Sequence, residues 1–164
     1  MATKSLLNLL NSAKYLYLRE ISEPRDNSLR LIVQEAVNNP VGTVVNLHPE
    51  LPELAEILKN ATPIESTPGC RTFELEWKRY VAYLVTEECV GLCGKYDDES
   101  FEGKLFRTYA RSHFLQHLER DTGGHIEQVM HYKLICLNHL IDVVAYHPPK
   151  IRLIAPEPEA PRIQ

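Results

Sequence analysis

Hydrophobic and polar residues alternate with a period of two in several segments, a pattern that predicts β-strands half-buried against a core. The first is KYLYLREI, residues 14–21, and the second is SLRLIVQEAV, residues 28–37. The residues between them, EPRDN at 23–27, have turn chemistry, because proline fixes φ and Asp or Asn closes a local turn. We therefore expect an antiparallel hairpin with a fairly long loop. Its buried face should carry Leu29, Leu31 and Val33.

The clearest alternation lies in FELEWKRYVAYLVTEE, residues 73–88. Its first half places Phe73, Leu75 and the single tryptophan, Trp77, on one side and two glutamates on the other. Alternation resumes after a Lys-Arg pair at 78–79. We interpret the segment as a second hairpin with its bend at this pair. Trp77 should then be buried and the glutamates should face water.

Three segments have the residue spacing of short amphipathic helices. One surrounds the leucines of residues 6–10, and a second follows the Pro-Glu-Leu-Pro sequence at 49–52, since proline is tolerated in a first turn. The third is HFLQHLERD, residues 113–121. Ser112 suits its N-cap because a serine hydroxyl can accept an otherwise unpaired backbone N–H, and the glycine pair at 123–124 should end it.

The segment HYKLICLNHLIDVVAY, residues 131–146, has the composition of a buried segment, yet it carries His131, Asn138, His139 and Asp142. Its β-branched and aromatic content favours strands, and its Leu-Asn-His break favours a bend between them. We expect Asn138 to adopt positive φ at this bend, because asparagine tolerates that conformation. Asn138 and His139 should satisfy nearby backbone groups, and Asp142 should form an ion pair or cap.

Further strands are predicted at 41–47, 104–109 and 151–154. The fold class is α+β, with a curved, mainly antiparallel sheet and two or three short helices. The 164 residues suit one domain, which we assign to residues 1–154. Residues 155–164 contain three prolines in ten positions, so we expect a mobile tail.

Composition is that of an ordinary soluble protein, with 44% hydrophobic and 24% charged residues and a net charge of -4. A nucleic-acid-binding protein normally carries a basic surface, so we expect no nucleic-acid partner. No stretch approaches the roughly 20 apolar residues of a membrane span. The leucine run near the N-terminus is too short for a signal peptide. We therefore expect a cytoplasmic protein with reduced cysteines and no membrane partner.

Two pairs of residues have spacing compatible with metal binding. Cys89 and Cys93 are separated by three residues, as are His113 and His117, which would share one face of a helix. Structural zinc sites usually have a tighter cysteine knuckle and a second matched pair. We therefore predict no bound metal and no cofactor.

Catalytic motifs are absent from the sequence: there is no Gly-x-Ser-x-Gly, no phosphate-binding glycine loop and no His-Glu-x-x-His. Cys136, His139 and Asp142 could in principle form a thiolate relay. On one strand, however, residues 136 and 139 point to opposite faces. We interpret all three as structural.

Carboxylates and aromatic residues cluster around the loop that follows residue 88. Charge runs are usually solvated, but acidic groups beside exposed aromatic rings can also form a docking surface for a basic protein. The candidate partner-binding residues are Glu87, Glu88, Tyr96, Asp97, Asp98, Glu99, Phe101 and Glu102.

Residues 70–150 resemble an uncharacterised family of small bacterial proteins. The resemblance rests on the hairpin-like segment above, on F-x-G-x-x-F-x-x-Y-x-x-S-x-F-L starting at Phe101, and on HYKLICLNHLIDVV starting at His131. In size, acidity and lack of motifs such proteins are loosely similar to single-domain immunity proteins of toxin systems, an analogy that implies no catalytic residues. The matching polar and aromatic positions are Tyr80, Tyr83, Glu87, Phe101, Gly103, Tyr109, Ser112, His131, Asn138, His139 and Asp142.

The leading hypothesis is a non-enzymatic, immunity-like bacterial protein that binds another protein, such as a basic toxin domain, through this acidic-aromatic surface. The alternative is an enzyme or metal-binding protein that uses His, Cys and Asp groups of residues 89–142. A third hypothesis is a self-assembling module that pairs through an exposed edge strand.

Overall fold

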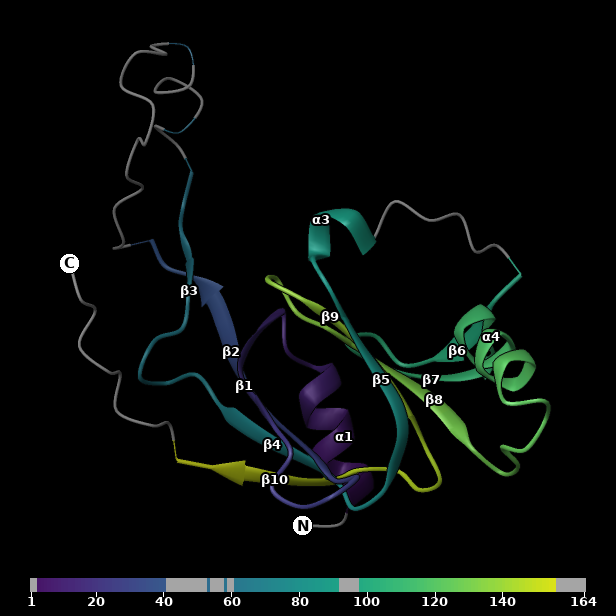
Figure 1. Cartoon of the computed structure of the whole chain (residues 1–164). Helices are drawn as coiled ribbons and strands as arrows, with labels where there is room; N and C mark the ends of the chain where they lie inside the picture. Colours follow the sequence, from purple (N-terminus) through teal and green to yellow (C-terminus); the bar gives the residue numbers. More distant parts are fainter. Residues whose placement is uncertain (1–2, 41–52, 54–57, 59–60, 92–97, 156–164) are drawn as a thin grey trace.

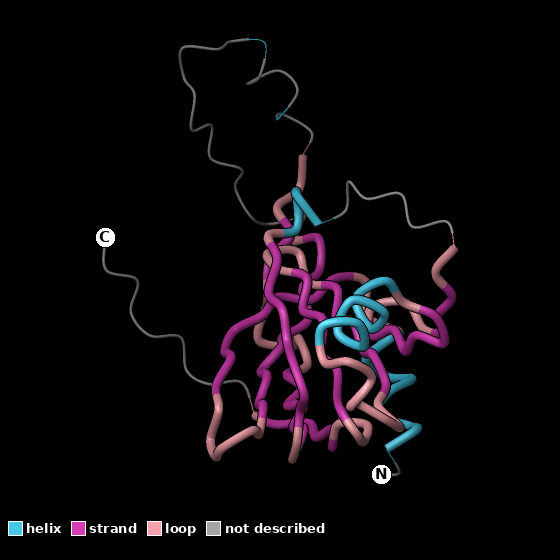
Figure 2. Tube along the Cα trace, turned by 45° about the vertical axis from the view of Figure 1, so that its right-hand side comes forward, coloured by secondary structure: helices cyan, strands magenta, loops and turns pink. Residues whose placement is uncertain are grey.

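A computed structural model describes residues 3–40, 53, 58, 61–91 and 98–155. Strands are the predominant secondary structure in this part of the chain and form two antiparallel five-stranded sheets, which we call sheet I and sheet II (Figures 1 and 2). Sheet I has the order β1 (Tyr15–Ser22), β2 (Leu29–Asn38), β4 (Thr72–Trp77) and β10 (Lys150–Ile154), and β3 (Ile64–Glu65) also pairs with β2. Sheet II has the order β5 (Tyr80–Thr86), β9 (Leu140–Ala145), β8 (Met130–Ile135), β7 (Phe106–Arg111) and β6 (Ser100–Glu102). The helices are α1 (Thr3–Asn11), α3 (Glu88–Gly91) and α4 (His113–Asp121).

One hydrophobic core joins the two sheets and α1. Trp77 of sheet I is buried, and its ring centroid lies 6.3 Å from that of Phe106 and 6.0 Å from that of Tyr132, both in sheet II. Leu6 and Leu10 add the apolar face of α1, which lies between the sheets in Figure 1. The fold is therefore α+β, as the sequence predicts, with the strands divided between two sheets.

The hairpin expected over residues 73–88 is wrong. Both halves are strands, but β4 pairs with β2 and β10, whereas β5 pairs with β9 in the other sheet. The chain turns a corner at Lys78 and Arg79 and leaves sheet I. The two strands lie in different sheets that pack on one core: Trp77 of β4 is buried in it, and Tyr80 and Tyr83 of β5 are partly buried against it.

Several other predicted elements are confirmed. The β1–β2 hairpin pairs as expected, and Leu29, Leu31 and Val33 are fully buried on one face. Helix α4 spans residues 113–121, and its backbone N–H at Leu115 donates to the hydroxyl of Ser112 at 3.1 Å. Predicted elements at 41–47 and 49–57 and the tail beyond residue 155 lie outside the described residues.

A network of ion pairs covers the outer face of sheet I. Glu74, expected to face water, is buried there, because Arg30 Nε and Arg152 Nη2 each approach its carboxylate oxygens to 2.7 Å. Burial opposes ionisation of Glu74, but hydrogen bonds from the two guanidinium groups outweigh it and lower the pKa of this carboxyl.

Candidate functional site

The outer face of sheet II holds a set of polar side chains that strand geometry brings together. Along β8, Tyr132 and Leu134 point into the core, so His131 and Lys133 point outward. Strand register places Tyr109 of β7 opposite His131, and Asp142 of β9 opposite Lys133. Ser112 reaches the same place because α4 begins directly after β7.

These residues form a continuous chain of hydrogen bonds. Ser112 Oγ lies 2.6 Å from His131 Nδ1, and His131 Nε2 lies 2.8 Å from Asp142 Oδ1. Lys133 Nζ lies 3.2 Å from the other carboxylate oxygen of Asp142. One proton assignment satisfies every member: Nε2–H donates to Asp142, and the Ser112 hydroxyl donates to Nδ1 while accepting the N–H of Leu115. His131 is neutral in this assignment.

Aromatic rings enclose His131. The ring of Tyr109 stacks on the imidazole with centroids 4.3 Å apart, and the ring of Phe114 in α4 meets it edge-on at 5.5 Å. Ser112 and His131 are each only 2% exposed. Ser112 and His131 are therefore shielded from water, with Phe114 of α4 packed against the imidazole.

Ser112, His131 and Asp142 are bonded in the order of a serine–histidine–acid relay, but on exchanged ring nitrogens: the serine meets Nδ1 and the carboxylate meets Nε2, whereas in the catalytic triad the serine meets Nε2 and the acid Nδ1. A nucleophile must meet its substrate, however, and the Ser112 hydroxyl is buried and already serves as the helix N-cap. A shallow depression on α4 is lined by Gln116, Glu119 and Arg120 and includes none of the three. In this arrangement the chain of bonds fastens α4 to sheet II.

The bend between β8 and β9 has a different role from the one expected. Strand, bend and strand are confirmed, but Asn138 is not among the non-glycine residues with positive φ in the described part of the chain, which are Asn27 and Gln128. Its side chain instead bonds the backbone of Leu18 in β1, with Oδ1 accepting from N–H and Nδ2 donating to C=O, both at 3.0 Å. Leu137 N–H also donates to Leu16 C=O, at 2.8 Å. The bend thus ties sheet II to the edge of sheet I.

The thiolate relay considered from the sequence, made of Cys136, His139 and Asp142, does not form. Asp142 is engaged by His131 and Lys133, and Cys136 lies in the core, where burial raises the pKa of its thiol to about 12. His139 accepts the Cys136 N–H with its backbone carbonyl, while its buried Nδ1 has no hydrogen-bond partner in the structure. A thiol held neutral in this way is a packing group rather than a nucleophile.

The residues considered for metal binding make other contacts. His113 Nε2 lies 2.6 Å from Asp98 Oδ1, and His117 Nε2 lies 3.4 Å from Asp121 Oδ2. Cys89 is exposed, and Cys93 lies outside the described residues. Within the described residues, no group of three or more His, Cys, Asp or Glu side chains has the geometry to hold a metal ion.

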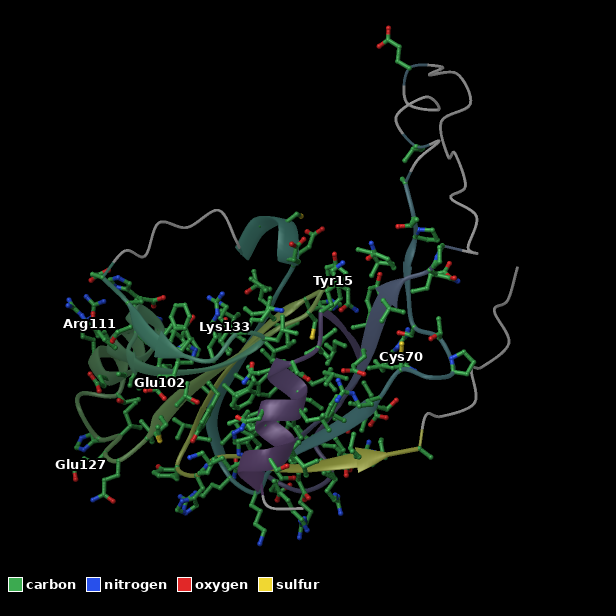
Figure 3. All side chains as sticks on the ribbon, turned by 180° about the vertical axis from the view of Figure 1, so that it is seen from behind. Tyr15, Cys70, Glu102, Arg111, Glu127 and Lys133 are labelled. Carbon is green, nitrogen blue, oxygen red and sulfur yellow. The ribbon has the colours of Figure 1, made fainter. Side chains whose placement is uncertain are left out.

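The acidic-aromatic candidates fall at two separate places. Glu87 and Glu88 follow β5 at one edge of sheet II, whereas the group from Asp98 to Glu102 leads into and forms β6 at the opposite edge. Four strand spacings separate these edges, or about 19 Å. Figure 3 shows Glu102 and Arg111 at the end of the molecule remote from Cys70 of the sheet I side. Tyr96 and Asp97 lie outside the described residues.

Phe101 is the centre of the group at β6. Its side chain is 43% exposed, its ring lies 5.2 Å from that of Tyr109, and the guanidinium of Arg107 sits 4.2 Å above it. Sequence reasoning missed Arg107. Its position two residues before Tyr109 on a strand is the signal that could have placed both on one face with Phe101.

The carboxylates beside Phe101 are held in place by neighbouring groups. Asp98 pairs with Arg111 at 3.1 Å and with His113, and the hydrogen bond from His113 is the largest cause of a lowered pKa at this carboxyl. Glu99 accepts the backbone N–H of His113 at 2.9 Å. The surface around Phe101 therefore combines fixed acidic groups with two arginines, rather than uniform negative charge.

Within the described residues, no helix is both long and apolar enough to cross a bilayer. No protein-family model, curated protein or solved structure matches the chain.

Proposed function

We propose that the chain is a non-enzymatic bacterial protein that binds another protein, in the manner of an immunity protein, through the β6–β7 corner of sheet II. The observation that supports this function best is the exposed Phe101 with Arg107 stacked on it. Aromatic residues and arginine are enriched at the energetic centres of protein interfaces. A ring supported by Tyr109 from the side and by Arg107 above loses little freedom on binding.

The exposed carboxylates among these mixed charges support a basic partner such as a toxin domain, with Arg107 and Arg111 lying beside them. Asp98 and Glu99 are oriented by their bonds to α4 and β7, and Glu102 is exposed on β6. Pre-oriented carboxylates steer a basic surface without a large entropic cost, and they fix the register in which it docks. Glu87 and Glu88 lie at the other edge of the sheet, so we omit them from this surface.

A serine hydrolase is the second candidate, favoured by the unbroken chain from Ser112 through His131 to Asp142. This function requires α4 to lift from the sheet and expose a 2% exposed serine. Treating the folded protein with a fluorophosphonate probe tests it. We expect no labelling of Ser112, and labelling at that residue would favour the hydrolase over the binding protein.

The binding function is tested with the purified products of the genes adjacent to its own, by calorimetric titration against the full chain. We expect one of them to bind and the Phe101→Ala variant to weaken its binding by at least about tenfold, as for a central interface residue. The matched control is Leu153→Ala, because Leu153 is 41% exposed on β10 of the other sheet. An adjacent gene product that binds the Phe101→Ala variant as tightly as the wild type, or no binding by any of them, would overturn the proposal.

A further inference from the structure

The edge strands of the two sheets differ in how they are protected against pairing. The edge of β1 is covered where Leu137 and Asn138 bond its backbone. Strand β10 carries Lys150 and Arg152, and β6 has three residues and includes a glutamate. Short length and charged side chains are the usual devices that keep an edge strand from pairing with another chain.

Strand β5 lacks these devices. Its seven residues, YVAYLVT, include no charge and no proline, and within the described part of the chain it pairs with β9 alone. Leu84 is 47% exposed and Val85, on the opposite face, is 38% exposed. Val90 in the following helix is 63% exposed. A row of unpaired backbone groups flanked by aliphatic side chains is a template for an added strand.

We infer that β5 pairs with β5 of a second copy of this chain, antiparallel and centred on Leu84. A two-fold axis there sets Leu84 opposite the partner's Leu84 and Tyr83 opposite the partner's Val85. Pairs of aromatic, aliphatic and β-branched residues are favourable across strands, and no like charges face each other. The same patch serves both copies, as a two-fold interface requires, and the two copies of sheet II join into one continuous sheet.

Charge complementarity favours a second copy over an unrelated strand. The antiparallel arrangement brings the start of β5 near the end of the other β5, so that the residues flanking the strand at its two ends come close to one another. Lys78 and Arg79 precede β5, while Glu87 and Glu88 follow it. The guanidinium of Arg79 lies 4.9 Å from the ring centroid of Tyr146, the residue that follows β9. Each end of the shared interface therefore brings basic residues of one copy near acidic residues of the other.

The first part of β5 is engaged within its own chain, which limits the free edge. The backbone N–H of Tyr80 donates to Asn27 C=O at 2.9 Å, and the Tyr83 hydroxyl donates to Glu23 at 3.0 Å. The exposed aliphatic groups lie beyond this point. The contact is consequently small, and dimerisation should depend on concentration.

Sedimentation velocity of the full chain over a range of concentrations tests the inference. We expect a monomer–dimer equilibrium. The Leu84→Lys substitution should raise the dimer dissociation constant by at least about tenfold, because it places two positive charges opposite each other at the two-fold axis. Leu153→Lys, an equally drastic change on an exposed residue of β10, should leave it unchanged. A monomeric wild type, or a dimer insensitive to Leu84→Lys, would overturn the inference.

A second pair of variants keeps the test decisive if Leu84→Lys fails to fold. Arg79→Glu should weaken the dimer by like-charge repulsion with Glu88 of the partner subunit, and adding Glu88→Arg should restore it. Equal dimerisation by the wild type and the Arg79→Glu variant would count against this register. Failure of dimerisation leaves binding at Phe101 intact, since the two surfaces lie at opposite edges of sheet II.

Discussion

The side-chain amide of Asn138 and the main chain of Leu18 form two reciprocal hydrogen bonds, both 3.0 Å long, that join sheet II to sheet I. A carboxamide is matched to this task because it offers one acceptor and one donor in the same plane. The pair fastens the bend after β8 to an edge strand that is 120 residues away in the chain.

The Asn138→Gly substitution should lower the free energy of unfolding by about 1–3 kcal/mol, because it leaves the two polar groups of Leu18 without partners. The matched control is Asn27→Gly. Asn27 has a φ of 58°, which glycine adopts freely, so this change should be neutral or slightly stabilising. Urea denaturation measures both values. Equal stability of the two variants would show that the hydrogen bonds between Asn138 and Leu18 do not stabilise the contact between the sheets.

The Trp77→Ala substitution should lower the free energy of unfolding by about 3–5 kcal/mol, since it removes the ring that connects the two sheets. Its indole N–H has no hydrogen-bond partner in the structure, so Trp77→Phe should cost much less. The control is Phe101→Ala, an exposed aromatic position, which should change stability by less than about 1 kcal/mol. A similar small loss for Trp77→Ala would place the indole outside the core.

The Gly103→Ala substitution should be strongly destabilising. Gly103 has a φ of 98°, and an added Cβ would lie 2.0 Å from the carbonyl oxygen of Phe106. This turn also presents three successive backbone N–H groups, at 104 to 106, to the side-chain oxygen of Asn11. Gly69→Ala is the control, because a Cβ there meets nothing within 4 Å. The melting temperature of the Gly103→Ala variant should be clearly lower than that of the Gly69→Ala variant. Equal melting temperatures would show that the turn accommodates the added methyl group.

Stability should fall in acid partly through Glu74. Its pKa is lowered in the fold from an ordinary value of 4.5, so the unfolded chain binds a proton more readily. Its contribution is therefore fully present above about pH 4.5 and is lost as pH falls through the lower, folded value. The Glu74→Gln variant should be less stable near neutrality, and its deficit should shrink on acidification. The control is Glu119→Gln, at an exposed position on α4. A deficit that stays constant with pH would show that the ionised carboxylate contributes nothing.

Local pattern was enough to predict most individual elements and the buried faces of several strands. Leu29, Trp77 and the N-cap at Ser112 follow from alternation and capping chemistry within a few residues of sequence. Pairing partners did not follow, because β4 and β5 carry the same alternation whether they pair with each other or lie in two different sheets that share a core. The prediction that Glu74 faces water is wrong for a related reason: the two arginines that pair with its buried carboxylate come from two other strands.

The candidate site shows the same limit. His131 and Asp142 stood out as polar residues in an apolar segment, and both are indeed buried. Their connection to Ser112 depends on the register of β8 with β7 and β9, which local sequence does not encode. The sequence correctly predicts that Asn138 lies in a bend. It predicts hydrogen bonds to the backbone of that bend, however, whereas the side chain bonds the backbone of β1.

The hydrogen bonds that link Ser112, His131 and Asp142 have a structural role rather than a catalytic one in this account. The free energy of unfolding of the Ser112→Ala variant tests this most directly, with the exposed Ser100→Ala as its control. Loss of the N-cap and of the partner of His131 Nδ1 should cost about 2–3 kcal/mol, whereas the control should change by less than about 0.5 kcal/mol. Active-site residues are often kept at some expense to stability. A Ser112→Ala variant as stable as the wild type, or more stable, would contradict the account and identify the buried chain as a working site.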